Sequence, residues 1–81
     1  MHQPPTTLAV DGAAICTKRM QAGLEVQELA EIVGISANYL RKLERGTRKH
    51  MGPGKYGRLR TALDATHEEL LAPTEVPTER K

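Results

Sequence analysis

The segment from Gly23 to Gly46 constrains the fold of this 81-residue chain more than any other part of it. Its first half carries four apolar residues at the spacing of one buried helical stripe: Val26, Leu29, Ala30 and Val33. Gly34 permits the positive φ of a sharp helix end, and Ser36 is a good N-cap for a second helix. The segment therefore predicts two short helices joined by a tight turn.

The second of these helices has two different sides. Leu40 and Leu43 are expected to point inward. The other side carries one amide and three basic residues: Asn38, Arg41, Lys42 and Arg45. A helix-turn-helix presents such a polar second helix to the major groove of DNA. The pattern therefore favours a DNA-reading element.

The remaining patterns extend this unit to an all-α domain with five helices. A capping box at Thr66–Glu69 is expected to open the last one. The expected helices cover residues 12–22, 25–33, 37–45, 54–63 and 66–71. Residues 47–54 are predicted to lack regular structure, because this link is rich in glycine and contains a proline.

The chain is predicted to consist of one small domain with two loose ends. Residues 1–10 are expected to form a flexible N-terminal arm, and residues 11–71 form the helix-turn-helix domain. Residues 72–81 are too polar and too rich in proline to pack, so we predict a disordered C-terminal tail. The chain has no Phe or Trp, so its core must be aliphatic.

The positive charge is concentrated in one stretch of the sequence. The whole chain has a formal net charge of only +2. Between residues 41 and 60, however, eight basic residues accompany a single acid, Glu44. A basic block that begins on the expected second helix of the helix-turn-helix indicates binding to nucleic-acid phosphates. The alternative is an ordinary solvated run of charge.

These features together resemble the lambda-repressor-like, Xre/Cro-type family of bacterial and phage DNA-binding domains, over about residues 11–71. The short motifs that carry the resemblance are Lys18–Leu24, Glu28–Ala30, Gly34–Ser36, Tyr39–Leu40, Leu43–Gly46 and Glu69–Leu71. None of these motifs is specific alone, but their joint spacing is.

The resemblance implies base contacts at Ala37, Asn38 and Lys42, with Arg41 close by. Asn38 has the chemistry to pair with adenine N6 and N7, and Lys42 or Arg41 with guanine N7 and O6. Ala37 offers a methyl group that suits the thymine methyl. The alternatives are a surface amide at the helix start for Asn38 and a phosphate-only or exposed side chain for Arg41.

Other positions are expected to bind the DNA backbone, which positions the helix without reading sequence. Arg45, Arg48 and Lys49 are expected phosphate ligands. Tyr39 resembles a family position whose hydroxyl reaches a phosphate, with core filling as the alternative. Where the family often has a phosphate-binding glutamine this chain has Val26, so Gln27 or backbone amides are the expected replacement. The link at 47–54 would either follow the backbone or enter the minor groove with Arg48 or Lys49.

The family also commonly joins the positions of Arg19 and Glu44 by a salt bridge between its first and third helices. Such a bridge would fix the recognition helix on its scaffold. It would also explain the only acid in the basic block. A partly buried pair need not add net stability, so its expected role is orientation.

The residue inventory argues against an enzyme. Ser36 is the only serine and is expected to cap a helix, which removes it as a nucleophile. Cys16 is the only cysteine, so an internal disulfide is excluded, and the three histidines are too scattered for a metal site. We expect no cofactor, no metal and no membrane segment, and a cytoplasmic location.

The sequence thus predicts a sequence-specific double-stranded DNA-binding protein without catalytic activity. We expect a small transcriptional regulator, a Cro-like repressor that occupies a palindromic operator as a homodimer. Dimer contacts are expected near the fourth and fifth helices, around Leu70, Leu71 and Val76. One alternative is an activator whose Glu28 and Glu31 contact RNA polymerase. The other is an antitoxin or adaptor-type protein-interaction module.

Overall fold

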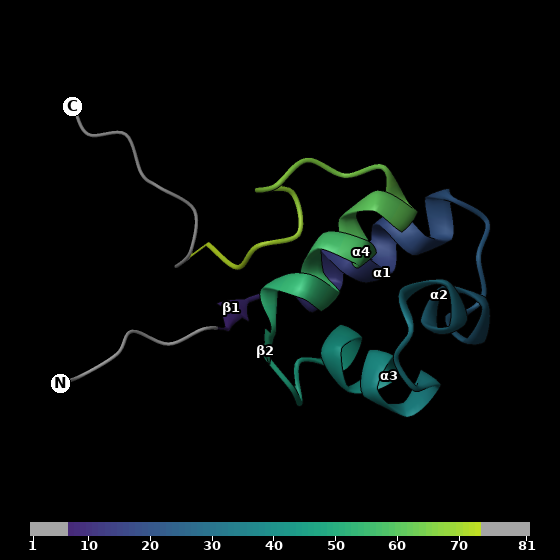
Figure 1. Cartoon of the computed structure of the whole chain (residues 1–81), viewed down its shortest axis with the longest axis horizontal. Coiled ribbons are helices and arrows are strands. Elements are labelled where there is room, and N and C mark those ends of the chain that lie inside the picture. Colours follow the sequence, from purple (N-terminus) through teal and green to yellow (C-terminus); the bar gives the residue numbers. More distant parts are fainter. Residues whose placement is uncertain (1–6, 74–81) are drawn as a thin grey trace, which may run out of the picture.

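The computed structural model describes residues 7–73, which form four helices and two short strands (Figure 1). The elements in chain order are β1 (Leu8–Ala9), α1 (Gly12–Gln21), α2 (Val26–Val33), α3 (Ala37–Arg45), β2 (His50–Met51) and α4 (Pro53–Leu63). Helix α3 packs against α1 and α2, and α2 also packs against α4. The mainly helical class and the helix-turn-helix are confirmed.

Two helices begin at the side-chain caps that the sequence indicated. The carboxylate of Asp11 accepts hydrogen bonds from the backbone N–H groups of Ala13 and Ala14, at 3.1 and 3.3 Å. The hydroxyl of Ser36 accepts a bond from the N–H of Tyr39 at 3.0 Å. Each contact satisfies N–H groups that the first turn of a helix leaves without a partner.

The turn between α2 and α3 depends on Gly34. Its φ of 87° is left-handed, a conformation that costs glycine least. The N–H groups of Gly34 and Ile35 both donate to the carbonyl of Ala30, at 2.8 and 3.0 Å, which closes α2. Only three residues separate the two helices, so that α3 begins at Ala37.

The short strands correct two expectations. Leu8 pairs with Met51 and Ala9 with His50 in an antiparallel ribbon. The predicted flexible arm therefore ends before residue 8, and the predicted irregular link at 47–54 contains a strand. Burial is the physical reason, because Ala9, Val10 and Met51 all lie in the core. Residues 1–6 of the arm and 74–81 of the tail lie outside the described residues.

The fifth helix is a third correction, because residues 67–70 form turns and no helix follows α4 in the described part of the chain. The Glu69 carboxylate does accept a hydrogen bond from the Thr66 N–H at 2.7 Å. This bond lowers the pKa of Glu69, as does the Lys18 ammonium group 3.5 Å away. Leu71, however, forms a β-bridge with Val10, which requires extended backbone and ends any helix there.

The core is aliphatic, as the composition requires, apart from one fully buried aromatic ring. Tyr56 of α4 is only 1% exposed, and its hydroxyl donates a hydrogen bond to the carbonyl of His67. Burial raises the pKa of this phenol. The fully buried aliphatic side chains come from α1, α2, α3, α4 and the C-terminal turns: Ile15, Leu29, Val33, Leu40, Leu43, Leu59 and Leu70.

Two helical glycines should respond oppositely to alanine substitution. A Cβ on Gly12 would lie 2.1 Å from the carbonyl oxygen of Leu43, because the start of α1 contacts the backbone of α3. We expect Gly12→Ala to lower the free energy of unfolding by ~1–3 kcal/mol or more. A Cβ on Gly57 would meet nothing within 4 Å, so Gly57→Ala should stabilise by up to ~1 kcal/mol through helix propensity. Urea unfolding of both variants checks this, and equal midpoints would contradict the close approach of α1 to α3.

Candidate nucleic-acid interface

Helix α3 presents one polar face to solvent. Its inner side is anchored by Leu40 and Leu43, which are both fully buried. Its Ser36 cap and its Gly46 end, with a φ of 84°, fix the length of the helix at nine residues. Four predicted site residues are exposed on the helix: Asn38, Arg41, Lys42 and Arg45. Ala37 and Tyr39 are half-buried at its start.

The segment that follows α3 is held against it and against the strands. The Arg48 N–H donates to the carbonyl of Lys42 at 3.1 Å. The Lys49 carbonyl accepts a hydrogen bond from the N–H of Val10 at 2.8 Å. The side chains of Arg48 and Lys49 remain exposed beside the basic face of α3. The structure thus brings five basic residues together on one side of the molecule.

Tyr39 connects α3 to this segment. The guanidinium carbon of Arg48 lies 4.9 Å from the centre of the Tyr39 ring. The Tyr39 hydroxyl donates a hydrogen bond to the carbonyl of His50 at 3.5 Å. Tyr39 packs against the core and is only half-buried.

Gln27 lies apart from the basic residues of α3, in the first turn of α2, and its side chain is exposed. The neighbouring Glu28 accepts a hydrogen bond from the Glu25 N–H at 2.8 Å, which fixes this helix start. Val26, where the family often has glutamine, packs against the core instead. Gln27 is therefore the exposed uncharged polar side chain in the first turn of α2.

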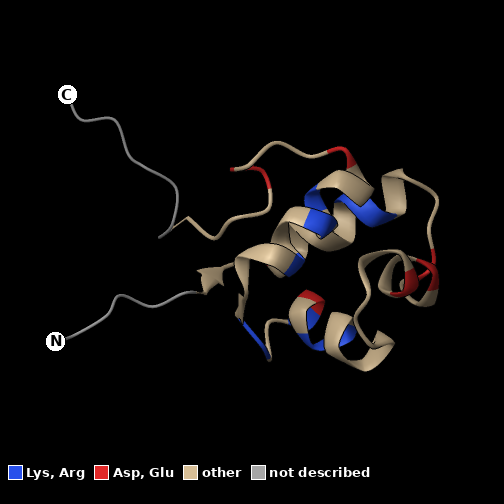
Figure 2. Cartoon of the chain, in the orientation of Figure 1, with Lys and Arg blue, Asp and Glu red and all other residues tan. Residues whose placement is uncertain are grey.

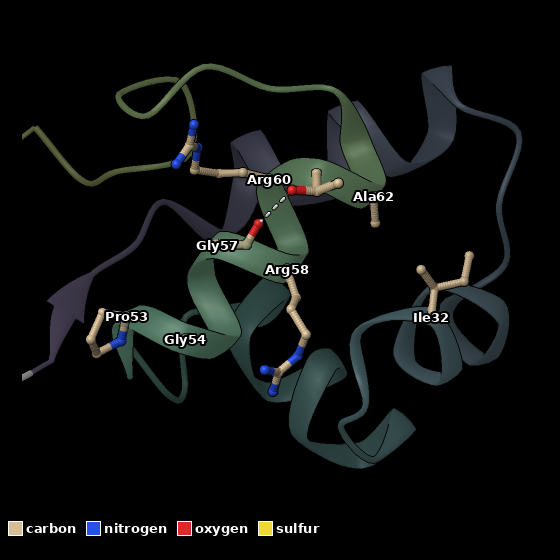
Figure 3. A pocket seen from close by; sticks show the side chains of 8 residues that line it. Ile32, Pro53, Gly54, Gly57, Arg58, Arg60 and Ala62 are labelled. Atoms are coloured by element: carbon tan, nitrogen blue, oxygen red, sulfur yellow. Dashed lines mark hydrogen bonds between the residues drawn. The ribbon is translucent and has the colours of Figure 1, made fainter.

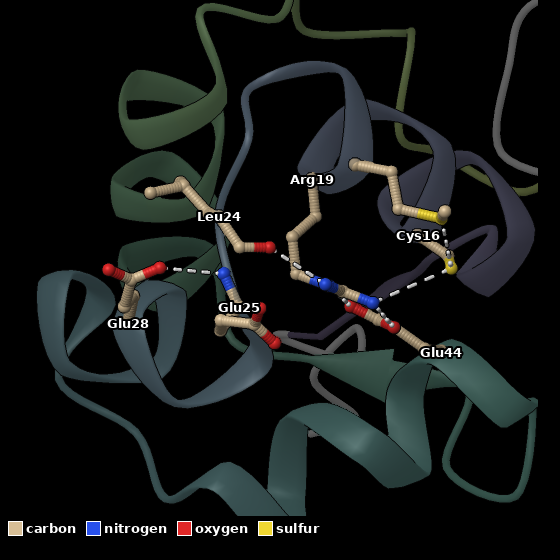
Figure 4. A network of polar contacts seen from close by, with 7 residues as sticks. Cys16, Arg19, Leu24, Glu25, Glu28 and Glu44 are labelled. Atoms are coloured by element: carbon tan, nitrogen blue, oxygen red, sulfur yellow. Dashed lines mark hydrogen bonds and ion pairs between the residues drawn. The ribbon is translucent and has the colours of Figure 1, made fainter.

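A bidentate ion pair ties α1 to α3 (Figure 4). The Nε and Nη2 atoms of Arg19 donate to the two carboxylate oxygens of Glu44, at 2.8 and 3.1 Å. Nη1 donates to the carbonyl of Leu24 at 2.8 Å, and Nη2 lies 3.8 Å from the Cys16 sulfur. The two side chains are only 13% and 9% exposed. The hydrogen bonds to Glu44 raise the pKa of Arg19 further above its ordinary value.

This arrangement joins three parts of the scaffold through one guanidinium group. Arg19 comes from α1, Leu24 from the loop before α2, and Glu44 from the last turn of α3. The planar fork of an arginine fixes both distance and angle when it binds a carboxylate with two hydrogen bonds. The pair therefore sets the rotation of α3 about its own axis, and with it the direction in which the polar face points.

Charge is unevenly distributed over the described residues (Figure 2). Basic residues lie on α1, on α3, on the segment after α3 and on α4, whereas α2 and its N-cap carry acidic residues. Those acids are Glu28 and Glu31 of α2 and Glu25 just before it. Glu44 is the only acid on α3, and its charge is paired with Arg19. The exposed face of α3 is thus uniformly positive.

Arg58 is a positioning residue that the sequence did not reveal. Its Nε donates to the carbonyl of Val33 at 2.8 Å, which caps the end of α2 just before the turn. The same arginine lines a shallow groove of about 570 Å³ between α2 and α4 (Figure 3). The other side of that groove is Ile32, whose side chain is 57% exposed. No sequence signal identifies this contact, because it depends on how α4 packs against α2.

Two further findings concern residues 7–73 alone. None of their helices has both the length and the apolar character needed to span a bilayer. Within the same residues, histidine, cysteine and carboxylate side chains do not gather in groups of three or more that would suit a metal ion.

Loss of the Arg19–Glu44 pair should destabilise the domain. Arg19→Ala leaves Glu44 almost buried without a partner, so we expect a loss of up to ~3–5 kcal/mol in the free energy of unfolding. Lys18→Ala is the matched control, because it removes only the more exposed pair with Glu69 and should cost less than ~1 kcal/mol. In the double variant Arg19→Ala/Glu44→Ala part of the loss should be recovered. Strictly additive losses in chemical unfolding would show that the pair carries no coupling energy.

The chain matches known proteins over the part that contains this interface. The family described as "Helix-turn-helix domain" matches residues 12–72. The solved structure of the restriction-modification controller protein C.AhdI from Aeromonas hydrophila is 31% identical, with a TM-score of 0.66, over 72% of this chain and 86% of that one. The clp gene regulator ClgR from C. glutamicum is 34% identical, with a TM-score of 0.61, over 68% and 70%.

SinR, the master regulator for biofilm formation from Bacillus subtilis, was solved in complex with DNA. It is 27% identical, with a TM-score of 0.67, over 72% of this chain and 94% of that one. Curated protein sequences give no significant match. The family match over residues 12–72 and the helix-turn-helix geometry show that the chain belongs to the Xre/lambda-repressor-like helix-turn-helix family of DNA-binding transcriptional regulators.

Proposed function

We propose that this protein is a sequence-specific double-stranded DNA-binding repressor of the Cro type, acting as a dimer on a palindromic operator in the cytoplasm. The observation that carries the proposal is the polar, uniformly basic face of α3. Its inner side is buried and its rotation is fixed by the Arg19–Glu44 pair. A helix held in this way presents its side chains to the major groove, and its backbone is already ordered before binding.

Base reading is assigned to the start and middle of α3. Asn38 is exposed in the first turn, where its amide suits the N6 and N7 atoms of adenine. Lys42 and Arg41 are exposed further along the helix and suit the N7 and O6 atoms of guanine. Ala37 adds a methyl contact. The remaining residues, Gln27, Tyr39, Arg45, Arg48 and Lys49, are assigned to phosphates that position the helix.

Substitutions should separate base reading from phosphate binding. After selection of a preferred site from a random duplex pool, Asn38→Ala and Lys42→Ala should each lose ~1–3 kcal/mol at particular base pairs. Lys49→Ala is the control, because a lost phosphate contact should weaken selected and scrambled duplexes alike. The measurement is the dissociation constant for each variant against single-base changes of the site. An Asn38→Ala variant with the parent's base preferences would place the reading surface elsewhere.

The same titrations decide between DNA binding and the protein-interaction alternative. If the protein neutralises about five to eight phosphates, the logarithm of its association constant for DNA should fall with the logarithm of the salt concentration, with a slope of roughly −5 to −7. Equal affinity for selected and scrambled duplexes would favour the antitoxin or adaptor function. Transcription from a promoter that carries the selected site distinguishes repression from activation, for which the exposed Glu28 and Glu31 of α2 would offer a contact to RNA polymerase.

The expected dimer surface needs correction. Leu70 and Leu71 are buried at 0% and 5% exposure, so they are not available for a partner, and Val76 lies outside the described residues. The groove between α2 and α4 is the better candidate. It combines the exposed Ile32 with Gly54 and Gly57 of α4, whose missing side chains allow a second backbone to approach closely.

Cooperative binding tests this dimer surface. The selected site should be an inverted repeat with half-site centres one helical turn apart, roughly 34 Å. Ile32→Glu should abolish cooperativity while leaving binding to a single half-site intact. Met20→Glu is the matched control, because Met20 is similarly exposed, at 67%, but lies outside this groove. If Ile32→Glu still binds cooperatively, the dimer surface lies outside this groove. A selected site that is a single half-site, bound by one protein molecule, would exclude the dimer.

A further inference from the structure

We propose that Tyr39 and Arg48 form one preorganised phosphate clamp beside the major groove, so that Arg48 binds the DNA backbone and does not enter the minor groove. This inference rests on the proposed DNA binding and concerns how that site is built. The sequence alone allows both positions for Arg48, because residues 47–54 could follow the backbone or reach into the minor groove.

The first argument is the direction of the Arg48 side chain. Its backbone N–H is bonded to the Lys42 carbonyl, in the last part of α3. Its guanidinium group nevertheless lies over the ring of Tyr39, which belongs to the first turn of the same helix. The Tyr39 ring extends from the first turn of α3 to the His50 carbonyl, so the Arg48 side chain lies against the flank of α3. Insertion into the minor groove would require it to leave the ring and extend away from α3.

The second argument is that the ring contact leaves the hydrogen-bonding edge of the guanidinium free. The guanidinium carbon lies 4.9 Å from the ring centre, and the Arg48 side chain makes no hydrogen bond or ion pair to the described residues. The five N–H donors of an arginine lie in its plane, and they are the donors that bind phosphate with two parallel bonds. Stacking and phosphate binding are thus compatible, and Tyr39 holds Arg48 in a binding orientation before DNA arrives.

The third argument concerns the hydroxyl of Tyr39. Its hydrogen bond to the His50 carbonyl is long, at 3.5 Å, against the ~2.7–2.8 Å of a typical O–H···O bond. A phosphate oxygen that approaches the same edge would offer the hydroxyl a shorter, charge-assisted bond. The hydroxyl and the guanidinium therefore serve one site, and neither is consumed by the fold.

Lys49 provides the contrast within the same segment. Its carbonyl is bonded to Val10, but its side chain is exposed and has no hydrogen bond or ion pair to the described residues. A lysine is a flexible point charge, whereas the stacked arginine is a fixed fork. A substitution of Arg48 that keeps the charge but changes the geometry should therefore lower the affinity of the protein for DNA.

The experiment compares charge-preserving variants on the selected duplex and on a scrambled duplex across a range of salt concentrations. Arg48→Lys should weaken both duplexes by about 3–10-fold with an unchanged salt slope, because the charge remains and the fixed fork is lost. Lys55→Arg is the matched control, because Lys55 is an exposed base of α4 outside the residues assigned to DNA, and it should leave both affinities within about twofold. Tyr39→Phe keeps the ring and should lose about 3-fold or more through the hydroxyl alone.

Coupling between the two residues is the decisive readout, since a purely structural role of Tyr39 would not produce it. Tyr39→Leu removes the stack, so adding Arg48→Lys should cost little more than Tyr39→Leu alone. Thermal melting of each variant identifies any that is unfolded, and the Tyr39→Phe arm remains informative if Tyr39→Leu is unstable.

Two results would overturn the clamp. Additive effects of Tyr39→Leu with Arg48→Lys would show that the residues act independently. Loss of an A·T preference at flanking base pairs in Arg48→Ala would place Arg48 in a narrow minor groove. Both results presuppose that the parent prefers its selected duplex. A parent that binds all duplexes equally would instead refute the proposed sequence-specific function.

Discussion

The bidentate pair between Arg19 and Glu44 is the interaction on which the geometry of the interface depends. Helix α3 has only nine residues, and two buried leucines alone would leave its rotation poorly defined. The guanidinium group of Arg19, on α1, donates fixed hydrogen bonds to Glu44 of α3 and to the loop carbonyl of Leu24. Burial of two charges removes much of their Coulombic benefit, so the pair contributes orientation more than net stability. Its effect on function is indirect, because neither side chain is exposed toward DNA.

The parts of this fold that sequence reasoning predicted are those with local causes. The stripe from Val26 to Val33, the left-handed Gly34 and the Ser36 cap each act within one helical turn, and each lies where it was expected. The exposed polar face of α3 follows from the same helical periodicity. The Arg19–Glu44 contact joins residues 25 positions apart, and only the resemblance to a family of known architecture suggested it.

The parts that sequence reasoning missed have non-local causes. Two-residue strands are too short for an alternating pattern, and Leu8 finds its partner Met51 only because the whole domain brings them together. Thr66 and Glu69 make the local contact of a helix start, yet the pairing of Leu71 with Val10 imposes extended backbone a few residues later. Tertiary pairing thus overrides a local signal. The Arg58 contact with Val33 depends likewise on packing between helices.

These non-local contacts matter for the interface because they determine how rigid the segment after α3 is. Val10 is bonded to the Lys49 carbonyl and is also bridged to Leu71, so the basic segment is linked to both ends of the described chain. On the other side, Arg48 and Tyr39 join it to α3. A loop held on both sides loses little conformational freedom when it binds a phosphate, which leaves more of the interaction energy for affinity. In the DNA binding that we propose, the small strands thus preorganise residues that they do not contain.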